Sequence, residues 1–296
     1  QGLVVEWLNA DRPVLQQLGI GACGVQRVAC NTYFAQAIAG DDLGVRLRAL
    51  RSVGELRRYD LLQPVLRCLE DAEDICRYQA AWSATMLGDK RGRESLRQFI
   101  ESPGPCRESA LGLALRAMEP ALAMQWLREQ NEQQESDRLV VQAAGILGDP
   151  VSVPWLIEKM KQPELARVAG ESFSLITGVD LAYDDLEGDW PEGFAAGPTE
   201  NPEDEDVALD ADEDLPWPDP ELIAQWWTNN QTGFPQGERH LCGRPISTEG
   251  CWDVLKKGFQ RQRRAAALEL ALLNPKKPLF NTSAPVKRQL RLLGNL

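Results

Sequence analysis

The 296-residue sequence predicts an all-α fold, an α-solenoid in which short helical hairpins stack one after another. Three observations lead to this prediction. Apolar residues recur at helical spacing, Gly and Pro interrupt them at short intervals, and an arginine recurs about every 30 residues. Each predicted helix is too short to be stable alone, so each must bury its apolar face against its neighbours.

The stretch 137–163 shows the predicted hairpin most clearly. A first helix is predicted over about 138–147, where apolar residues form one stripe. Gly148 is expected to end it, because glycine accepts the left-handed conformation found just after a helix. Ser152 is expected to cap a second helix, and Pro154 fits the first turn of that helix, where a missing N–H costs nothing.

The hairpin recurs along the chain, with steps of 31, 30, 31 and 29 residues between equivalent arginines. A glycine about eleven positions after the arginine ends the helix at Gly88, Gly148 and Gly178. A helix–turn–helix unit of this period is typical of HEAT-like solenoids. We interpret the repeat arginines as structural residues that tie one repeat to the next, not as ligand-binding residues; they are Arg46, Arg77, Arg107, Arg138 and Arg167.

Charge is distributed unevenly. Sixteen Asp and Glu residues lie between Asp184 and Glu221, and no Lys or Arg occurs between Arg167 and Arg239. The net charge of −12 comes from this segment, because the other 28 acidic residues face 32 basic ones. The segment has no helical period and reads as an extended linker, either a solvated tether or a chain lying against a basic surface.

These features divide the chain into three expected parts. A HEAT-like α-solenoid covers 1–189, an acidic Pro-rich linker 190–220, and a basic helical region 221–296 that docks on the solenoid. On a helix, one of two adjacent tryptophans can face inward while the other points away, so an exposed aromatic is expected. The candidate partner-binding residues are Trp226, Trp227, Lys256, Lys257, Arg261 and Arg263.

The sequence offers no set of catalytic or metal-binding residues. His240 is the only histidine, and no P-loop, dinucleotide-binding or nucleophile-elbow motif occurs. His240, Cys242 and Cys251 would make three zinc ligands, but their spacing is not standard and a fourth ligand is missing. We therefore predict no catalytic residue, no metal and no cofactor.

The cysteines and the hydropathy bear on location. Seven cysteines occur without a CxxC pair, and those at apolar helical positions are expected to be reduced core thiols of a cytoplasmic protein; these are Cys30, Cys68, Cys76 and Cys106. No apolar run approaches the roughly 20 residues that a membrane span needs.

Two stretches resemble the signature blocks of a known family. They are GDPVSVPWLIEKMKQPELARVAGESFSLITGVDLAYDDLEGD (148–189) and the stretch 237–285, which begins GERHLCGRPIS. They resemble a HEAT-like bacterial family that is encoded beside type VI secretion genes, often near the VgrG spike and its effectors. The resemblance is close over the last half of the chain and extends to the first half only as repeats.

The resemblance implies an accessory role in secretion, as an adaptor or loading factor, with no catalytic residues to carry over. Members of the family are longer at the N-terminus, so we expect this chain to be a fragment. We therefore expect a non-enzymatic, cytoplasmic bacterial protein that acts as an interaction scaffold. Its partner would be a VgrG spike protein or its effector, with no membrane among its partners.

An alternative class is a nucleic-acid-acting HEAT-like protein of the DNA glycosylase type. Such proteins use a basic groove with Trp and Asp, and Trp82, Trp126 and Trp155 keep this alternative open. However, these tryptophans recur inside predicted repeat helices, where core packing explains them better. The acidic linker would also compete with phosphate for the basic surface, so we expect no nucleic acid as partner.

Overall fold

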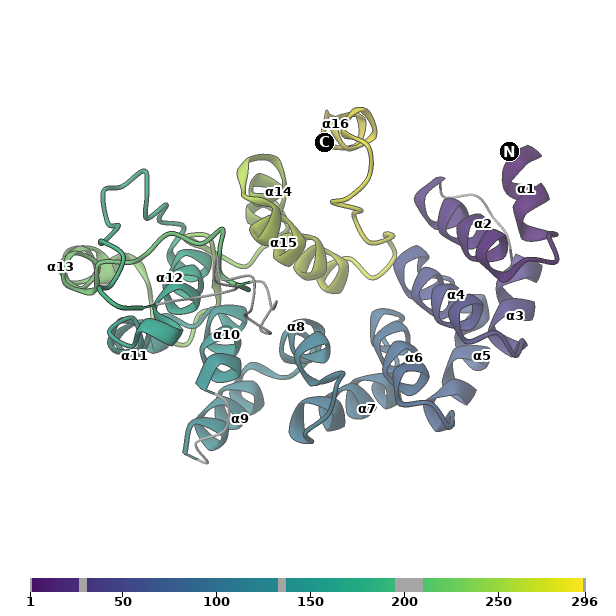
Figure 1. Ribbon diagram of the computed structural model, residues 1–296, viewed down its shortest axis with the longest axis horizontal. Helices are drawn as coiled ribbons and strands as arrows, with labels where there is room; N and C mark the ends of the chain where they lie inside the picture. Colours follow the sequence, from purple (N-terminus) through teal and green to yellow (C-terminus); the bar gives the residue numbers. More distant parts are fainter. Residues whose placement is uncertain (1, 27–30, 133–136, 195–209, 295–296) are drawn as a thin grey trace. The chain divides into compact units, whose positions relative to one another are not determined.

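Figure 1 shows the computed structural model, which describes residues 2–26, 31–132, 137–194 and 210–294. Sixteen α-helices make up most of these residues. The strands within the described ranges are two short antiparallel ones, β1 (His240–Leu241) and β2 (Arg244–Pro245). The prediction of an all-α protein is therefore confirmed for the described part of the chain.

The chain forms two compact units, one made of residues 1–119 and 247–296 and one of residues 120–246. They do not coincide with the expected ranges 1–189, 190–220 and 221–296, which stay a prediction. The helices of the first unit are α1 (Gly2–Leu8), α2 (Pro13–Gln26), α3 (Asn31–Ala39), α4 (Leu43–Leu56), α5 (Leu62–Arg67), α6 (Asp74–Met86), α7 (Lys90–Glu101), α8 (Arg107–Ala117), α14 (Thr248–Lys257), α15 (Gln260–Leu273) and α16 (Val286–Gly294). Those of the second unit are α9 (Pro120–Glu132), α10 (Asp137–Leu147), α11 (Val153–Lys159), α12 (Pro163–Thr177) and α13 (Pro220–Asn230).

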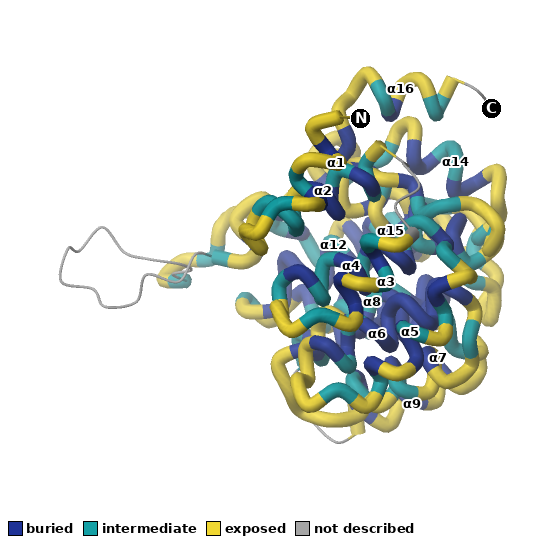
Figure 2. The backbone as a smooth tube through the Cα atoms, turned by 90° about the vertical axis from the view of Figure 1, so that its right-hand side faces the viewer, coloured by how far each residue is buried: buried dark blue, intermediate teal, exposed yellow. Residues whose placement is uncertain are grey.

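Helices of the first unit pack largely in sequence order. α4 packs against both α2 and α6, and α7 packs against both α6 and α8. Figure 2 shows buried backbone concentrated on α4, α6 and α8, where side chains such as Leu50, Met86 and Leu111 are fully buried. Burial between neighbouring helices therefore stabilises elements that would be marginal in isolation.

One interhelical contact occurs in both units. In the first, Gly54 of α4 lies against Ser83 of α6, whose hydroxyl donates to the Leu50 carbonyl at 2.7 Å. In the second, Gly145 of α10 lies against Ser172 of α12, whose hydroxyl donates to the Val141 carbonyl. A Cβ on either glycine would come within 2.8 Å of the serine side chain, so glycine is required for this close approach.

The repeat arginines of the first unit bind backbone carbonyls a few residues upstream. Arg46 donates to the Gly40 carbonyl at 3.1 Å, and Arg77 to the Asp71 carbonyl at 2.6 Å. Arg107 donates to the Ile100 carbonyl at 3.0 Å. Each of these arginines thus joins the start of its own helix to the end of the preceding element.

The helix ends largely follow the predicted pattern. Gly88, Gly148 and Gly178 all have left-handed backbone conformations, with φ of 80°, 72° and 77°. Ser152 differs from prediction, because its side chain makes no capping hydrogen bond. Asp149 instead accepts a hydrogen bond from the Val151 amide, so the carboxylate caps a short 3-10 turn (Pro150–Ser152) that precedes α11.

Two of these glycines provide a matched stability test. We expect Gly88→Ala to lower the free energy of unfolding by about 1 kcal/mol, the usual cost of a left-handed alanine, because a Cβ there meets no atom within 4 Å. Gly148→Ala should cost clearly more, because its Cβ would lie 2.2 Å from the His240 carbonyl oxygen. Urea denaturation of both variants measures the difference, and equal losses would contradict the close approach of β1.

The C-terminal part of the first unit is fastened to its N-terminal helices. The buried Arg57 side chain donates to the Ala271 carbonyl, and the Leu279 amide donates to the Glu55 carbonyl at 2.8 Å. Glu269 of α15 lies 3.1 Å from Arg116 of α8, with both side chains only 4% exposed. These contacts fasten the described C-terminal residues to α4 and α8 within the first unit.

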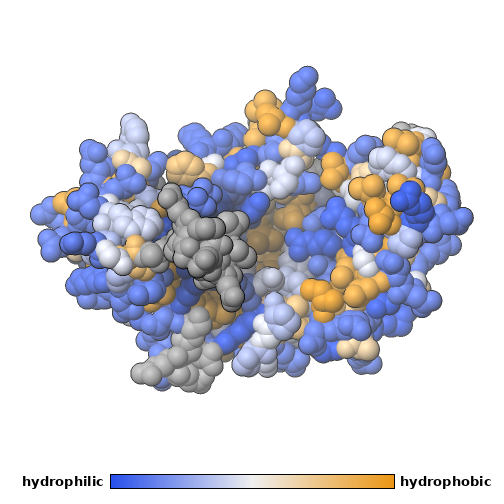
Figure 3. Space-filling view, in the orientation of Figure 1, coloured by the Kyte–Doolittle hydropathy of each residue, from blue (hydrophilic) through white to orange (hydrophobic). Residues whose placement is uncertain are grey.

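Hydrophobic side chains remain exposed on the first helices of this unit. Leu3, Val14 and Leu18 are each more than half exposed. Figure 3 shows the corresponding hydrophobic surface over α1 and α2, at the right of the view.

The second unit is built on α10 and α12. α11 packs against α12 and α13, and β1 packs beside α12. The His240 amide donates to the Gly148 carbonyl at 2.8 Å, and the Cys242 amide to the Leu175 carbonyl at 2.7 Å. The hairpin of β1 and β2 is therefore held by the carbonyl groups at the ends of α10 and α12.

Cys68, Cys76 and Cys106 are free and buried, as expected, and Cys30 lies outside the described residues. Cys23, which was not among the cysteines expected to be reduced, is disulfide-bonded. Among the described residues, none of the helices has the length and apolar character that crossing a bilayer requires.

Candidate functional site: an arginine-lined pocket in the first unit

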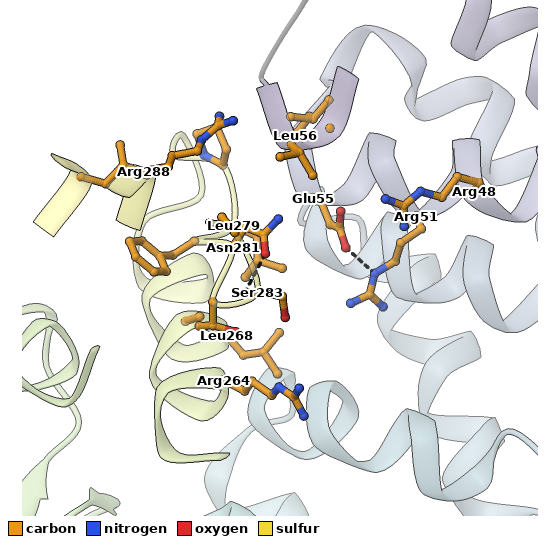
Figure 4. Close-up of a pocket in the computed structure, with 18 residues that line it drawn as sticks. Arg48, Arg51, Glu55, Leu56, Arg264, Leu268, Leu279, Asn281, Ser283 and Arg288 are labelled. Atoms are coloured by element: carbon orange, nitrogen blue, oxygen red, sulfur yellow. Dashed lines mark hydrogen bonds and ion pairs between the residues drawn. The ribbon is translucent and has the colours of Figure 1, made fainter. Parts of the chain in front are cut away.

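The first unit contains a pocket of about 510 Å³ between its N-terminal and C-terminal parts. Helices α2 and α4 line one side; α15, α16 and the connecting segment 278–284 line the other (Figure 4). The hydrogen bond from the Leu279 amide to the Glu55 carbonyl holds the connecting segment beside α4. This pocket is hereafter called the arginine pocket.

Two of its arginines come from α4. The guanidinium carbon of Arg51 lies 3.5 Å from the ring centre of the buried Trp82, and its Nε lies 2.8 Å from Glu55. Arg48 crosses α2 at Gly21, where a Cβ would lie 2.9 Å from Nη2 of the arginine. Stacking on an aromatic ring and a glycine opposite the second side chain therefore position both guanidinium groups.

The other two arginines, Arg264 of α15 and Arg288 of α16, come from the opposite side (Figure 4). Within the described residues, Glu55 is the one acidic side chain that lines the pocket. Arg48, Arg264 and Arg288 make no ion pair with any described residue. Four arginines and one carboxylate thus line the pocket, which gives it a positive potential.

The lining is not uniformly polar. Leu56, Leu268 and Leu279 contribute partly buried apolar surface, and the neutral polar side chains of Asn281 and Ser283 lie among the arginines (Figure 4). The site can therefore donate hydrogen bonds to an anionic ligand and also cover apolar groups. In the part of the chain that the structure describes, the pocket contains no histidine, cysteine or paired carboxylates to perform catalysis.

A second charged cluster lies in the second unit. Arg138 of α10 makes two hydrogen bonds of 2.6 Å to the Asp212 carboxylate. Arg167 of α12, which is buried, lies 2.7 Å from Asp210 and donates to the Asp212 carbonyl at 2.9 Å. Its guanidinium also lies 5.3 and 5.2 Å from the ring centres of two aromatic side chains, Trp190 and Trp217.

This cluster changes the interpretation of two repeat arginines. Arg138 and Arg167 bind acidic residues of the segment predicted to be a linker. The other three repeat arginines differ, because they bind nearby backbone carbonyls; they are Arg46, Arg77 and Arg107. The hydrogen bond from Arg167 lowers the pKa of Asp210. The described end of the acidic segment therefore lies against basic residues, which was one of the two alternatives expected. Residues 195–209 of this segment lie outside the described residues.

The candidate partner-binding residues do not form one site. Trp227 is buried, whereas Trp226 is partly exposed and packs edge-on against Phe173 with ring centres 5.6 Å apart. Both belong to the second unit, whereas the basic candidates belong to the first. Lys256, Lys257 and Arg261 are exposed, while Arg263 donates to the Leu255 carbonyl and to Gln289.

Sequence reasoning did not single out the arginine pocket. Arg48, Arg51 and Glu55 follow helical three- and four-residue spacing, which could have indicated a charged face on α4. Arg264 and Arg288 lie more than 200 residues further along the chain, and no local pattern relates them to α4.

The other candidates from the sequence have structural positions. His240 is buried and its Nδ1 lies 2.8 Å from the Glu238 carbonyl. Among the described residues, no group of three potential ligands is arranged to hold a metal ion. Trp82 and Trp126 are buried in helix packing, as core packing predicted.

Comparison with known proteins adds no family to this description. No protein-family model matches the chain, and a search of curated proteins finds no significantly similar sequence.

Proposed function

We propose that this protein is a non-enzymatic scaffold that binds another protein, built as a HEAT-like α-solenoid. Solenoids present a long surface of stacked helices and act by binding. The arginine pocket is the observation that carries the proposal, because it gathers three arginines that make no ion pair with a described residue on a partly apolar surface.

The repeated contacts support the solenoid part of the proposal. The arginine-to-carbonyl bonds of Arg46, Arg77 and Arg107 recur at intervals close to 30 residues. The glycine–serine contact recurs between α4 and α6 and again between α10 and α12. Units that repeat both sequence and contacts are the signature of repeat architectures.

For the biological role, we propose an adaptor or loading factor of a bacterial type VI secretion system. The support is the resemblance of 148–189 and 237–285 to a family encoded beside such genes. The partner would then be a VgrG spike protein or its effector, and the protein would act in the cytoplasm without a cofactor.

Site-specific photo-crosslinking in the organism of origin tests this proposal. A photoreactive residue in place of Asn281, which is exposed and lines the arginine pocket, should capture a spike protein or an effector. The matched control is Glu94, exposed on α7, where capture of the same protein should be much weaker. A crosslink to nucleic acid at Asn281, or no protein crosslink at either position, would contradict the proposal.

The four arginines also favour an anionic ligand, so the DNA glycosylase alternative needs a direct assay. We expect no release of damaged bases from duplex DNA by the purified chain. Catalytic turnover that a single point mutation abolishes would show that the protein is an enzyme and reject the scaffold function.

A further inference from the structure

The charges in the arginine pocket favour a ligand of opposite charge. Arg48, Arg51, Arg264 and Arg288 line one space together with a single carboxylate, Glu55. Like charges that line one space repel, and this repulsion is stronger in a partly enclosed site than in water. Contacts within the first unit do not neutralise these charges, because three of the four arginines make no ion pair with a described residue. An anion entering the pocket would relieve the repulsion.

We propose that the arginine pocket binds an acidic peptide segment of a partner protein, one in which Asp or Glu residues alternate with large apolar residues. The inference rests on the proposed scaffold function and names the chemistry of the partner at this site. Arginine suits this ligand, because its planar guanidinium forms paired hydrogen bonds with a carboxylate.

The apolar part of the lining distinguishes a peptide from other anions. Leu56, Leu268, Leu279 and Phe280 line the same pocket as the four arginines. Inorganic phosphate or a nucleic-acid backbone would leave these side chains uncovered, whereas a leucine or phenylalanine of a peptide would bury them. Burying such a side chain contributes about 1.5–3 kcal/mol, comparable to an ion pair in a desolvated site.

The size and rigidity of the pocket fit a short peptide. Its volume of about 510 Å³ lies within the range of ordinary ligand pockets and accommodates a few side chains, not a folded domain. Arg51 is already stacked on Trp82, and the connecting segment is fixed by the hydrogen bond between Leu279 and Glu55. A preformed site loses less conformational entropy on binding, so a short peptide can bind measurably.

The connecting segment adds neutral hydrogen-bonding groups to this site. Asn281 and Ser283 are exposed and line the pocket between the arginines. The backbone of this segment is supported from behind, because Gln289 and Gln260 both donate to the Thr282 carbonyl. An extended peptide could therefore lie along this segment with its acidic side chains directed to the arginines of both sides.

Fluorescence anisotropy with labelled peptides and the full chain tests the proposal. The probe is a peptide of about 12 residues in which Glu and Leu alternate, so that a few neighbouring side chains can enter the pocket while the rest of the peptide stays outside. The comparison peptide has Ser in place of each Leu and the same charge. We expect the Glu/Leu peptide to bind at least about tenfold more tightly than the Glu/Ser peptide, which corresponds to one buried apolar side chain.

Charge reversal identifies the site. Arg264→Glu combined with Arg288→Glu should weaken binding of the Glu/Leu peptide at least about tenfold, as expected for residues central to binding. The matched control is Lys256→Glu with Lys257→Glu, which makes the same change of charge on exposed residues of α14 outside the pocket. Binding to the control should change by less than about threefold at physiological salt, where distant charges are screened. The single variant Arg264→Gln provides a milder change if the double variant does not fold.

Several outcomes would overturn the proposal. These are undetectable binding of the Glu/Leu peptide, equal binding of the two peptides, and an equal loss in the pocket and control variants. Tighter binding of single-stranded DNA, lost in the pocket variant, would assign the site to nucleic acid instead. If peptide binding fails while crosslinking still captures a spike or effector elsewhere on the chain, the scaffold function stands and the assignment of this pocket is wrong.

Discussion

Replacing Glu269 by alanine should lower the free energy of unfolding of the first unit by about 3–5 kcal/mol, one of the two largest effects that we expect. The Glu269 carboxylate lies 3.1 Å from the Arg116 guanidinium, and both side chains are 4% exposed. Removing the carboxylate leaves a buried positive charge without its counter-ion, and such a charge is far less stable in the protein interior than in water.

Urea denaturation monitored by amide hydrogen exchange in α8 and α15 measures this loss in the first unit, whether or not the second unit unfolds separately. The double variant Arg116→Met with Glu269→Leu should recover most of it, because apolar side chains of similar volume can replace a buried ion pair. Glu249→Ala, an exposed carboxylate on α14, serves as the control and should change stability by less than about 0.5 kcal/mol. A small effect of Glu269→Ala would show that this pair is not buried.

Replacing Arg167 by alanine should destabilise the second unit by a similar amount, about 3–5 kcal/mol. The Arg167 side chain is 5% exposed, pairs with Asp210 at 2.7 Å and lies against Trp190 and Trp217. The variant therefore loses an ion pair and aromatic contacts together. Arg138→Ala should cost only about 1 kcal/mol, because Arg138 is one-third exposed and water can replace its bonds to Asp212.

Trp fluorescence during urea denaturation reports this unit through Trp190 and Trp217, and the exposed Arg128 of α9 is the matched control. Arg128→Ala should leave stability nearly unchanged. Equal effects of Arg167→Ala and Arg128→Ala would contradict the buried position of Arg167.

The same cluster predicts a pH dependence. The hydrogen bond from Arg167 lowers the pKa of Asp210 in the folded state. A carboxyl whose pKa is depressed on folding stabilises the protein above its unfolded pKa, about 3.9 for Asp, and loses this contribution as the pH falls through the folded value. Stability of the second unit should therefore decrease below about pH 4. Asp210→Asn should remove the contribution of Asp210 to this loss of stability at low pH. Urea denaturation curves recorded over a series of pH values measure the difference between the variant and the original protein.

The elements of the fold follow from local rules that operate within a few residues. Gly88, Gly148 and Gly178 were expected to end helices because only glycine accepts a left-handed backbone at little cost, and all three have positive φ. The helix over 138–147 follows from apolar spacing and begins one residue earlier in the structure. Ser152 shows the limit of this reasoning. Serine and aspartate both cap helices well. Which of Ser152 and Asp149 makes the capping hydrogen bond depends on the backbone conformation of the folded protein.

The sequence by itself therefore determined the helical class and the glycines that end helices at Gly88, Gly148 and Gly178. Only the tertiary structure decided which distant charges meet. Arg116 pairs with Glu269, Arg167 with Asp210, and α4 shares the arginine pocket with α15 and α16. The physical reason is range: backbone conformation and side-chain spacing act locally, whereas a buried ion pair or a pocket depends on which segments pack together. In the sequence, Glu269 is one acidic residue in an apolar helix, and only packing against α8 makes it the counter-ion of a buried arginine.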